Sequence, residues 1–107
     1  MTHTKAEFEA ALKSFYEGCQ RIHAEGCANH GYEDDSKWDL HRLKRWVRIV
    51  RPSAFAFVDM ETGDVLKTGG YDRPAITKTQ RGNIFDKHNG LQHINMYGVS
   101  YARDIPK

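Results

Sequence analysis

The sequence has few of the residues that mark specialised protein classes. Of its 107 residues only two are cysteine and three are proline, which disfavours a disulfide scaffold or a proline-rich linker. No apolar run approaches the roughly 20 residues that a membrane helix needs. The first residues lack the basic, then apolar, then small-residue order of a secretory signal. We therefore expect a chain that has no membrane partner and stays in the cytoplasm.

Motifs of catalysis are also missing. Gly69 and Gly70 lack the spacing and the lysine of a phosphate-binding loop, and no serine or cysteine stands with a matching base. The segment 86–95 (DKHNGLQHIN) superficially resembles part of the HNH nucleases, but Asp86 and His88 are not adjacent and no second metal ligand follows. We therefore expect neither an enzyme nor a cofactor.

The best candidates for metal ligands lie near one another early in the chain. They are Cys19, His23, Cys27 and His30. A cysteine and a histidine four residues apart share one face of a helix, and all four residues are of types that bind zinc. The Cys-x-x-Cys knuckle of structural zinc sites is absent, and Cys19 also fits a buried helix stripe. We predict two free thiols and no metal, with a zinc site as the alternative.

What the sequence does contain is typical of a globular protein. Hydrophobic residues make up 39% and charged residues 28%, and the length suits one domain over residues 1–107. The charge is uneven, because residues 1–36 carry three basic and seven acidic side chains (−4) and residues 37–107 carry thirteen and seven (+6). Such a division favours an anionic partner for the basic part, although a solvated basic face gives the same pattern.

A helix is predicted over residues 5–25. Thr4 and Glu7 form a capping box at its start, and Gly26 is suited to end it. Gly18 costs the helix about 1 kcal/mol relative to alanine, which indicates a close packing contact there. Apolar residues recur at three- and four-residue steps and predict the buried stripe: Phe8, Leu12, Phe15, Cys19 and Ile22.

The next two segments are less regular. Residues 27–36 are small and acidic and indicate a loop, after which Ser36 and Asp39 form a possible second capping box for a short helix or turn. Residues 43–51 fit a helical face as well as a strand. We favour a strand over 45–51, because WVRIV is rich in aromatic and β-branched residues and Pro52 follows it.

The later part of the chain predicts β-structure. Residues 54–58 alternate as a strand that points Phe55 and Phe57 to one face, and a turn with Gly63 returns the chain over 65–68. The result is a three-stranded meander over 45–68, whose apolar face the helix covers. A long loop over 69–96, with Ile84, Phe85 and Leu91 in the core, leads to a short strand over 97–103. The fold class is therefore α+β, an N-terminal helix packed on a small antiparallel sheet.

Four blocks resemble a family of small proteins encoded by tailed bacteriophages. They cover roughly the last sixty residues and read FAFVDMETGDVLK (55–67), RGNIFD (81–86), NGL (89–91) and YGVSYAR (97–103). In that family a Lys-Pro-Ala-Ser-Trp type segment and then a Pro-Ala-Lys segment precede the RGN box. Here Tyr71 stands at the tryptophan position, and the Pro-Ala step is retained as Pro74-Ala75. The resemblance implies a phage origin and carries no activity with it.

Basic and aromatic residues are the remaining functional signal. Arginines grip phosphates and exposed rings stack on bases, so we expect a phage accessory protein of the host cytoplasm that binds single-stranded nucleic acid. A competing interpretation places Trp46 in the core and leaves the charges to keep the sheet edge soluble. The alternative function is that of a modulator or inhibitor that binds a host protein. The predicted nucleic-acid site comprises Trp46, Arg48, Arg51, Tyr71, Arg73, Lys78 and Arg81.

Overall fold

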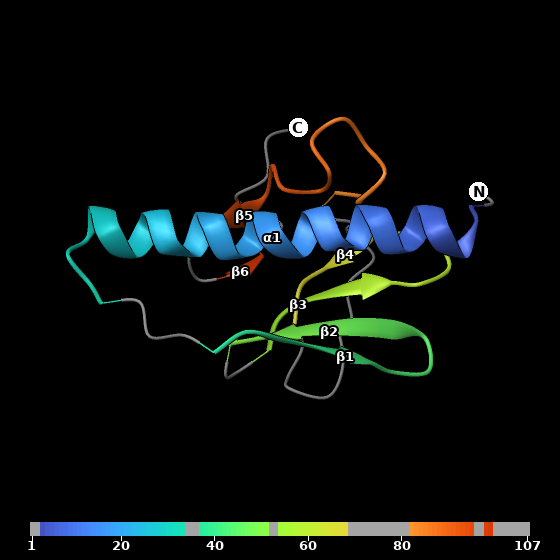
Figure 1. Cartoon of the computed structure of the whole chain (residues 1–107), viewed down its shortest axis with the longest axis horizontal. Coiled ribbons are helices and arrows are strands. Elements are labelled where there is room, and N and C mark those ends of the chain that lie inside the picture. The colour runs from blue at the N-terminus through green and yellow to red at the C-terminus, as the bar shows by residue number, and fades with distance from the viewer. Residues whose placement is uncertain (1–2, 34–36, 52–53, 69–81, 96–97, 100–107) are drawn as a thin grey trace.

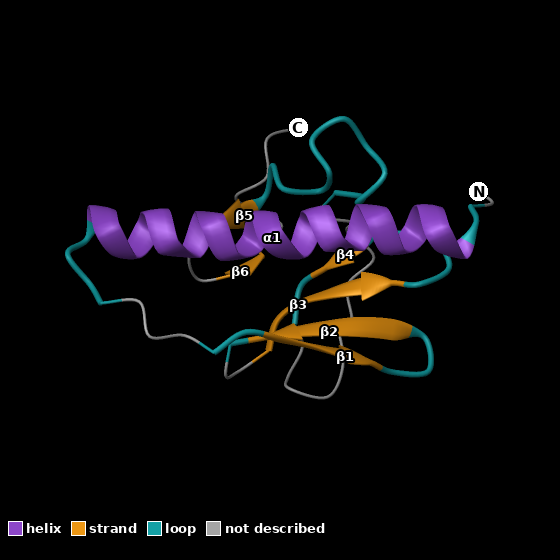
Figure 2. Ribbon diagram, in the orientation of Figure 1, coloured by secondary structure: helices purple, strands orange, loops and turns teal. Residues whose placement is uncertain are grey.

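One long helix packs on an antiparallel sheet, which confirms the predicted α+β class (Figures 1 and 2). The structure is a computed structural model and describes residues 3–33, 37–51, 54–68, 82–95 and 98–99. Helix α1 runs the length of the molecule in Figure 1. The elements are α1 (Lys5–Asn29), β1 (Asp39–Arg42), β2 (Trp46–Val50), β3 (Ala54–Asp59), β4 (Val65–Leu66), β5 (Ile94–Asn95) and β6 (Gly98–Val99).

Helix α1 begins as predicted and ends later than predicted. The Thr4 hydroxyl accepts the Glu7 amide at 3.0 Å and the Glu7 carboxylate accepts the Thr4 amide at 2.8 Å, so the capping box is present. Gly26 was expected to end the helix, but it lies within it, and the positive φ of 72° falls at Gly31. Cys27, expected in a loop, is therefore a buried helical residue.

The main sheet contains four strands in the order β1-β2-β3-β4, all antiparallel. The predicted strands at 45–51, 54–58 and 65–68 are confirmed as β2, β3 and β4. The expected short helix or turn after Ser36 is wrong, because Asp39–Arg42 pairs with β2 as an additional strand. Ser36 itself lies outside the described residues, and the carboxylate of Asp39 accepts the amide of Leu40 at 2.8 Å.

The helix covers one face of this sheet. The core cluster joins Phe8, Leu12 and Phe15 of α1 to strand residues that are cross-strand neighbours on that face, namely Val47, Ile49, Ala56, Val58 and Val65. Phe57 was predicted on the helix face beside Phe55, and this is wrong. The pairing slips between Ile49 and Val50, so Phe55 joins the helix-side core while Phe57 is buried on the opposite face.

The RGN and NGL blocks build a fixed segment against the helix and the β3–β4 turn. The Asn83 amide donates to Thr62 O at 2.8 Å, and the Asn89 amide donates to Ala11 O at 3.1 Å. Ile84, Phe85 and Leu91 enter the core or pack on it, as predicted. A β-carbon at Gly18 would stand 2.4 Å from Leu91 Cδ1, which confirms the expected close contact.

The predicted loop over 69–96 and the predicted strand over 97–103 are only partly described. Ile94–Asn95 forms β5 instead of loop, and it pairs antiparallel with Gly98–Val99, which is β6. The remaining residues of the predicted last strand lie outside the described ranges. A β-carbon at Gly98, where φ is 121°, would meet Phe55 O at 2.8 Å. The close approach of β6 to β3 therefore requires glycine at this position.

Candidate binding groove

Two turns lie side by side at one end of the main sheet and enclose an open groove. The amide of Met60, in the β3–β4 turn, donates to the carbonyl of Arg45, in the β1–β2 turn, at 3.0 Å. The hollow between the turns has a volume of about 750 Å³. Its lining is formed by Leu43, Lys44, Arg45, Trp46, Met60 and Glu61.

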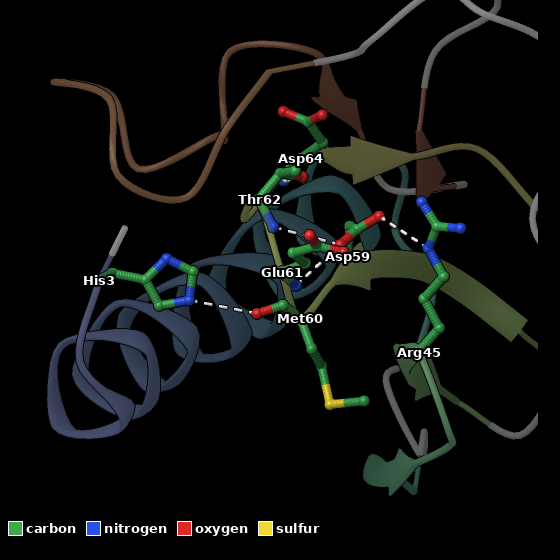
Figure 3. Close-up of polar contacts among 7 residues, drawn as sticks. All are labelled: His3, Arg45, Asp59, Met60, Glu61, Thr62 and Asp64. Atoms are coloured by element: carbon green, nitrogen blue, oxygen red, sulfur yellow. Dashed lines mark hydrogen bonds and ion pairs between the residues drawn. The ribbon is translucent and has the colours of Figure 1, made fainter. Parts of the chain in front are cut away.

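A buried carboxylate holds the two turns in place. Asp59 is only 6% exposed, and its Oδ1 accepts the amides of Glu61 at 2.8 Å and Thr62 at 3.2 Å. Its Oδ2 accepts Arg45 Nε at 3.4 Å, an ion pair across the turns (Figure 3). Because these bonds occupy both oxygens, Asp59 acts as a support for the groove rather than as a ligand-binding group.

The groove is also fixed from the helix side. The His3 ring donates from Nε2 to the carbonyl of Met60 at 3.1 Å (Figure 3). The same ring stacks on Phe8 at 5.5 Å and lies 4.8 Å from the Phe85 ring, centroid to centroid. The backbone of Met60 is therefore held between the Arg45 carbonyl and the start of α1, which leaves its side chain to line the hollow.

An aromatic ring and two cations meet in this groove. Trp46 is half-buried, and its ring stands edge-on to Phe57 with the centroids 6.4 Å apart. Lys44 is exposed, and 63% of the Arg45 side chain is accessible. A ring held by packing next to long flexible cations provides both a stacking surface and groups that pair with anions.

Three of the predicted nucleic-acid residues lie in the described part of the chain, and they do not share one face of the sheet. Trp46 and Arg48 project from the same face of β2, where Arg48 Nη2 donates to His41 Nδ1 at 3.0 Å. Arg51 lies apart from them, because its guanidinium sits 5.8 Å from the centre of the Phe55 ring, on the helix-side core. The other predicted residues, Tyr71, Arg73, Lys78 and Arg81, lie outside the described ranges.

Five of the six residues that line the groove were not predicted from the sequence to belong to a site. Lys44 and Arg45 belong to a cluster of basic residues that is visible in the sequence, but nothing local indicated that they occupy a tight turn. Leu43 and Met60 gave no signal at all, since the contact between their turns joins residues 15 positions apart through Arg45 O and Met60 N. Non-local hydrogen bonds of this kind leave no periodic pattern.

The predicted metal-ligand candidates are brought together only in part. His23 Nε2 and Cys27 Sγ are 3.4 Å apart and buried. Burial raises the pKa of the Cys19 thiol well above its ordinary value, while His30 is exposed and stacks on Tyr32 at 5.7 Å. Among the described residues, no three His, Cys, Asp or Glu side chains are placed to hold a metal ion.

In the segment 86–95, which resembles a nuclease motif, the carboxylate of Asp86 has a structural role. Burial alone would raise the pKa of Asp86, but hydrogen bonds from the amides of Gly90, Asn83 and His88 and from the Gln92 side chain hold it below its ordinary value. The carboxylate is therefore occupied by its own loop. His88 is exposed on the surface of that loop.

Comparisons with known proteins assign this chain to no family. Family models, curated proteins and solved structures give no significant match to this chain. Within the described ranges, no helix has the length and apolar composition that crossing a bilayer requires. The groove is therefore interpreted from its own chemistry.

Proposed function

We propose that this protein acts by binding single-stranded nucleic acid in the groove between the β1–β2 and β3–β4 turns. The observation that carries the proposal is that Trp46 lines the same hollow as Lys44 and Arg45. Sequence-tolerant binding of single strands combines bases stacked on aromatic rings with cations along the phosphates. The groove supplies one ring and two cations, and these three residues follow one another in the sequence.

The charge of the surrounding strands supports this proposal. Residues 37–51, which contain β1, β2 and their turn, carry six basic side chains and one acidic side chain. Arg42 is ion-paired with Glu9 and Arg45 with Asp59, so part of this charge is offset. Lys44 has no ion-pair partner among the described residues and is the cation most available to a phosphate. The setting is a phage accessory protein in the host cytoplasm, as the four resembling blocks suggest.

The decisive measurement is the anisotropy of a fluorescein-labelled oligothymidylate at about 50 mM salt, where electrostatic binding is strong. The variant Lys44→Glu should weaken binding and reduce the salt slope by about 0.7, the value for one lost phosphate contact. The matched control Lys37→Glu makes the same charge change in the segment just before β1, away from the turn, and should have a much smaller effect. Flat isotherms for the wild type, or equal losses in both variants, would refute the proposal.

A second readout tests the stacking contact. Binding should quench the fluorescence of Trp46, and the variant Trp46→Phe should lose this quenching while it keeps most of the ring stacking. Polyphosphate, which offers charge without bases, should bind without the quenching. Equal quenching by both polymers would show that no base reaches the ring.

One feature favours a second candidate, the modulation of a host protein. Leu43 and Met60 add apolar surface to the groove, and apolar anchors rimmed by charge are typical of protein interfaces. Affinity purification from host lysate, with and without nuclease treatment, separates the two candidates. A partner that survives nuclease and is lost in Met60→Glu supports protein binding, whereas recovery of nucleic acid that Lys44→Glu abolishes supports the first proposal.

A further inference from the structure

Strand β1 forms an edge of the main sheet, and its outer side carries backbone groups without a strand to receive them. The amide of Leu43 donates to Trp46 O at 2.8 Å and sets the ladder between β1 and β2. Because hydrogen-bonded and non-bonded pairs alternate in an antiparallel ladder, the peptide groups of Leu40 and Arg42 point away from β2. Edges of this kind are templates for the pairing of another strand.

Side chains of β1 itself occupy part of this edge. Asp39 Oδ1 accepts the Leu40 amide at 2.8 Å, and Asp39 Oδ2 lies 3.2 Å from His41 Nε2. Asp39 is exposed and Leu40 and His41 are half-exposed. Among the described residues, no other segment hydrogen-bonds the outward peptide groups of β1. Pairing with another strand would therefore break the exposed bond between the Leu40 amide and Asp39 Oδ1 and form a ladder of backbone hydrogen bonds in its place.

We infer that β1 pairs antiparallel with β1 of a second copy of this chain, about a twofold axis at Leu40. In that register Asp39 faces His41 of the second copy, and His41 faces Asp39 of the second copy. Arg42 then lies opposite Trp38 of the second copy, an arrangement that favours a cation–π contact. The His41 ring accepts from Arg48 at Nδ1 and is therefore free to donate from Nε2 to the facing carboxylate. Hydrogen-bonded and cation–aromatic pairs on facing strands stabilise a sheet, and twofold symmetry makes every such contact twice.

The alternative registers are less complementary. Outward peptide groups must face one another, and axes through Asp39, His41 or Arg42 also satisfy this condition. They place two Asp39 carboxylates, two His41 rings or two Arg42 guanidinium groups opposite each other, and none of them brings His41 opposite Asp39. Like charges on facing positions destabilise a pair of strands. The charge pattern Asp-Leu-His-Arg of β1 therefore selects the register at Leu40.

The helix side of β1 offers apolar surface to the second copy. A hollow of about 310 Å³ lies between α1 and β1 and is lined by Glu9, Leu12, Lys13, Tyr16, Leu40 and Arg42. Leu40 is half-exposed at the border of this hollow. In the inferred register its counterpart in the second copy lies directly opposite and covers the same hollow. The pairing thus buries apolar surface as well as forming backbone bonds.

Sedimentation equilibrium of the full chain, from about 10 µM to about 1 mM, tests the inference through the concentration dependence of assembly. The wild type should form dimers, and Asp39→Lys should raise the dissociation constant by about tenfold because both facing His41 rings lose the carboxylate that accepts from Nε2. The double variant Asp39→Lys with His41→Glu should restore dimers, since each introduced ammonium group then faces an introduced carboxylate. Glu17→Lys, the same charge change on the outer face of α1, should leave the constant unchanged. A wild type that stays monomeric, or equal effects of Asp39→Lys and Glu17→Lys, would overturn the pairing.

Disulfide trapping tests the register independently of nucleic-acid binding. Positions 39 and 41 of facing strands form a non-hydrogen-bonded pair, with the Cα atoms about 4.5 Å apart, within the range that a disulfide spans. A mixture of Asp39→Cys and His41→Cys chains should therefore give the mixed disulfide under mild oxidation. His41→Cys alone should give none, and the wild type is the control because Cys19 and Cys27 are buried. A homodisulfide of His41→Cys, or no disulfide in the mixture, would overturn the inferred register.

Discussion

Single residues fix the conformation of the segment 82–92 from within, and Asp86 has the largest part in this. Its carboxylate accepts four hydrogen bonds from the same loop. The variant Asp86→Asn keeps one acceptor oxygen but presents an NH₂ group to the remaining donors. We expect it to lower the free energy of unfolding by about 1–3 kcal/mol, as measured by urea denaturation. His88→Ala, in the same loop but with an exposed side chain, is the matched control and should be nearly neutral.

The same residue predicts a pH dependence. The pKa of Asp86 is lower in the folded protein than its ordinary value, so its contribution to stability is complete above the unfolded-state pKa of about 3.9. That contribution is lost as the pH falls through the folded-state pKa. Between pH 5 and pH 2, roughly, the wild type should therefore lose more stability than Asp86→Asn. Parallel curves for the two proteins would contradict this role.

The sequence predicts single residues well where local periodicity decides their position. Phe8, Leu12 and Phe15 repeat with the period of a helix, and all are buried as expected. Phe57 was misplaced because a slip in the pairing of β2 with β3 reverses the alternation between Ala54 and Ala56. That slip depends on a partner strand, so no pattern within residues 54–58 reveals it.

At the scale of elements, α1 packs closely on the segment 82–95 where Gly18 faces Leu91. Gly18→Ala should gain about 1 kcal/mol of helix propensity but force Leu91 to move, which typically costs about 1–3 kcal/mol. We expect the single variant to be destabilising. In the background of Leu91→Ala the same change should become stabilising, so a double-mutant cycle measures the contact. A change in free energy that is the same in both backgrounds would exclude it.

The elements differ in how well their own residues predict them without the help of distant partners. Trp46–Val50 was predicted as a strand because aromatic and β-branched residues dominate it, and tertiary contacts agreed with that preference. Asp39–Arg42 was missed, since a four-residue strand with one aliphatic side chain shows no alternation on its own. Ile94–Asn95 was missed for a related reason, because two residues become a strand only through their pairing with Gly98–Val99.

At the scale of the whole molecule, the sequence contains the uneven charge and predicted the α+β architecture, but it predicted only part of the groove. Of the residues that line the groove only Trp46 belonged to the predicted site, and Arg51, which was grouped with it, lies over the Phe55 ring. Lys44, Arg45 and Met60 come together because two turns dock through Asp59. Such docking depends on a buried ion pair and on main-chain bonds between distant residues, so neither composition nor spacing indicates it.

The long sequence separation between helix α1 and the strands on which it packs has a consequence for the rate of folding. The sheet residues that share the core cluster with Leu12, such as Val47 and Val58, lie more than thirty residues further along the chain. Closing such a loop is slow compared with the formation of neighbouring hairpins, so the meander should form in the transition state and the helix should dock after it. Val58→Ala should therefore slow refolding, whereas Leu12→Ala should mainly accelerate unfolding in stopped-flow chevron plots. If Leu12→Ala slowed refolding as much as Val58→Ala, the helix would be part of the nucleus, and the early chain would fold by a different order of events.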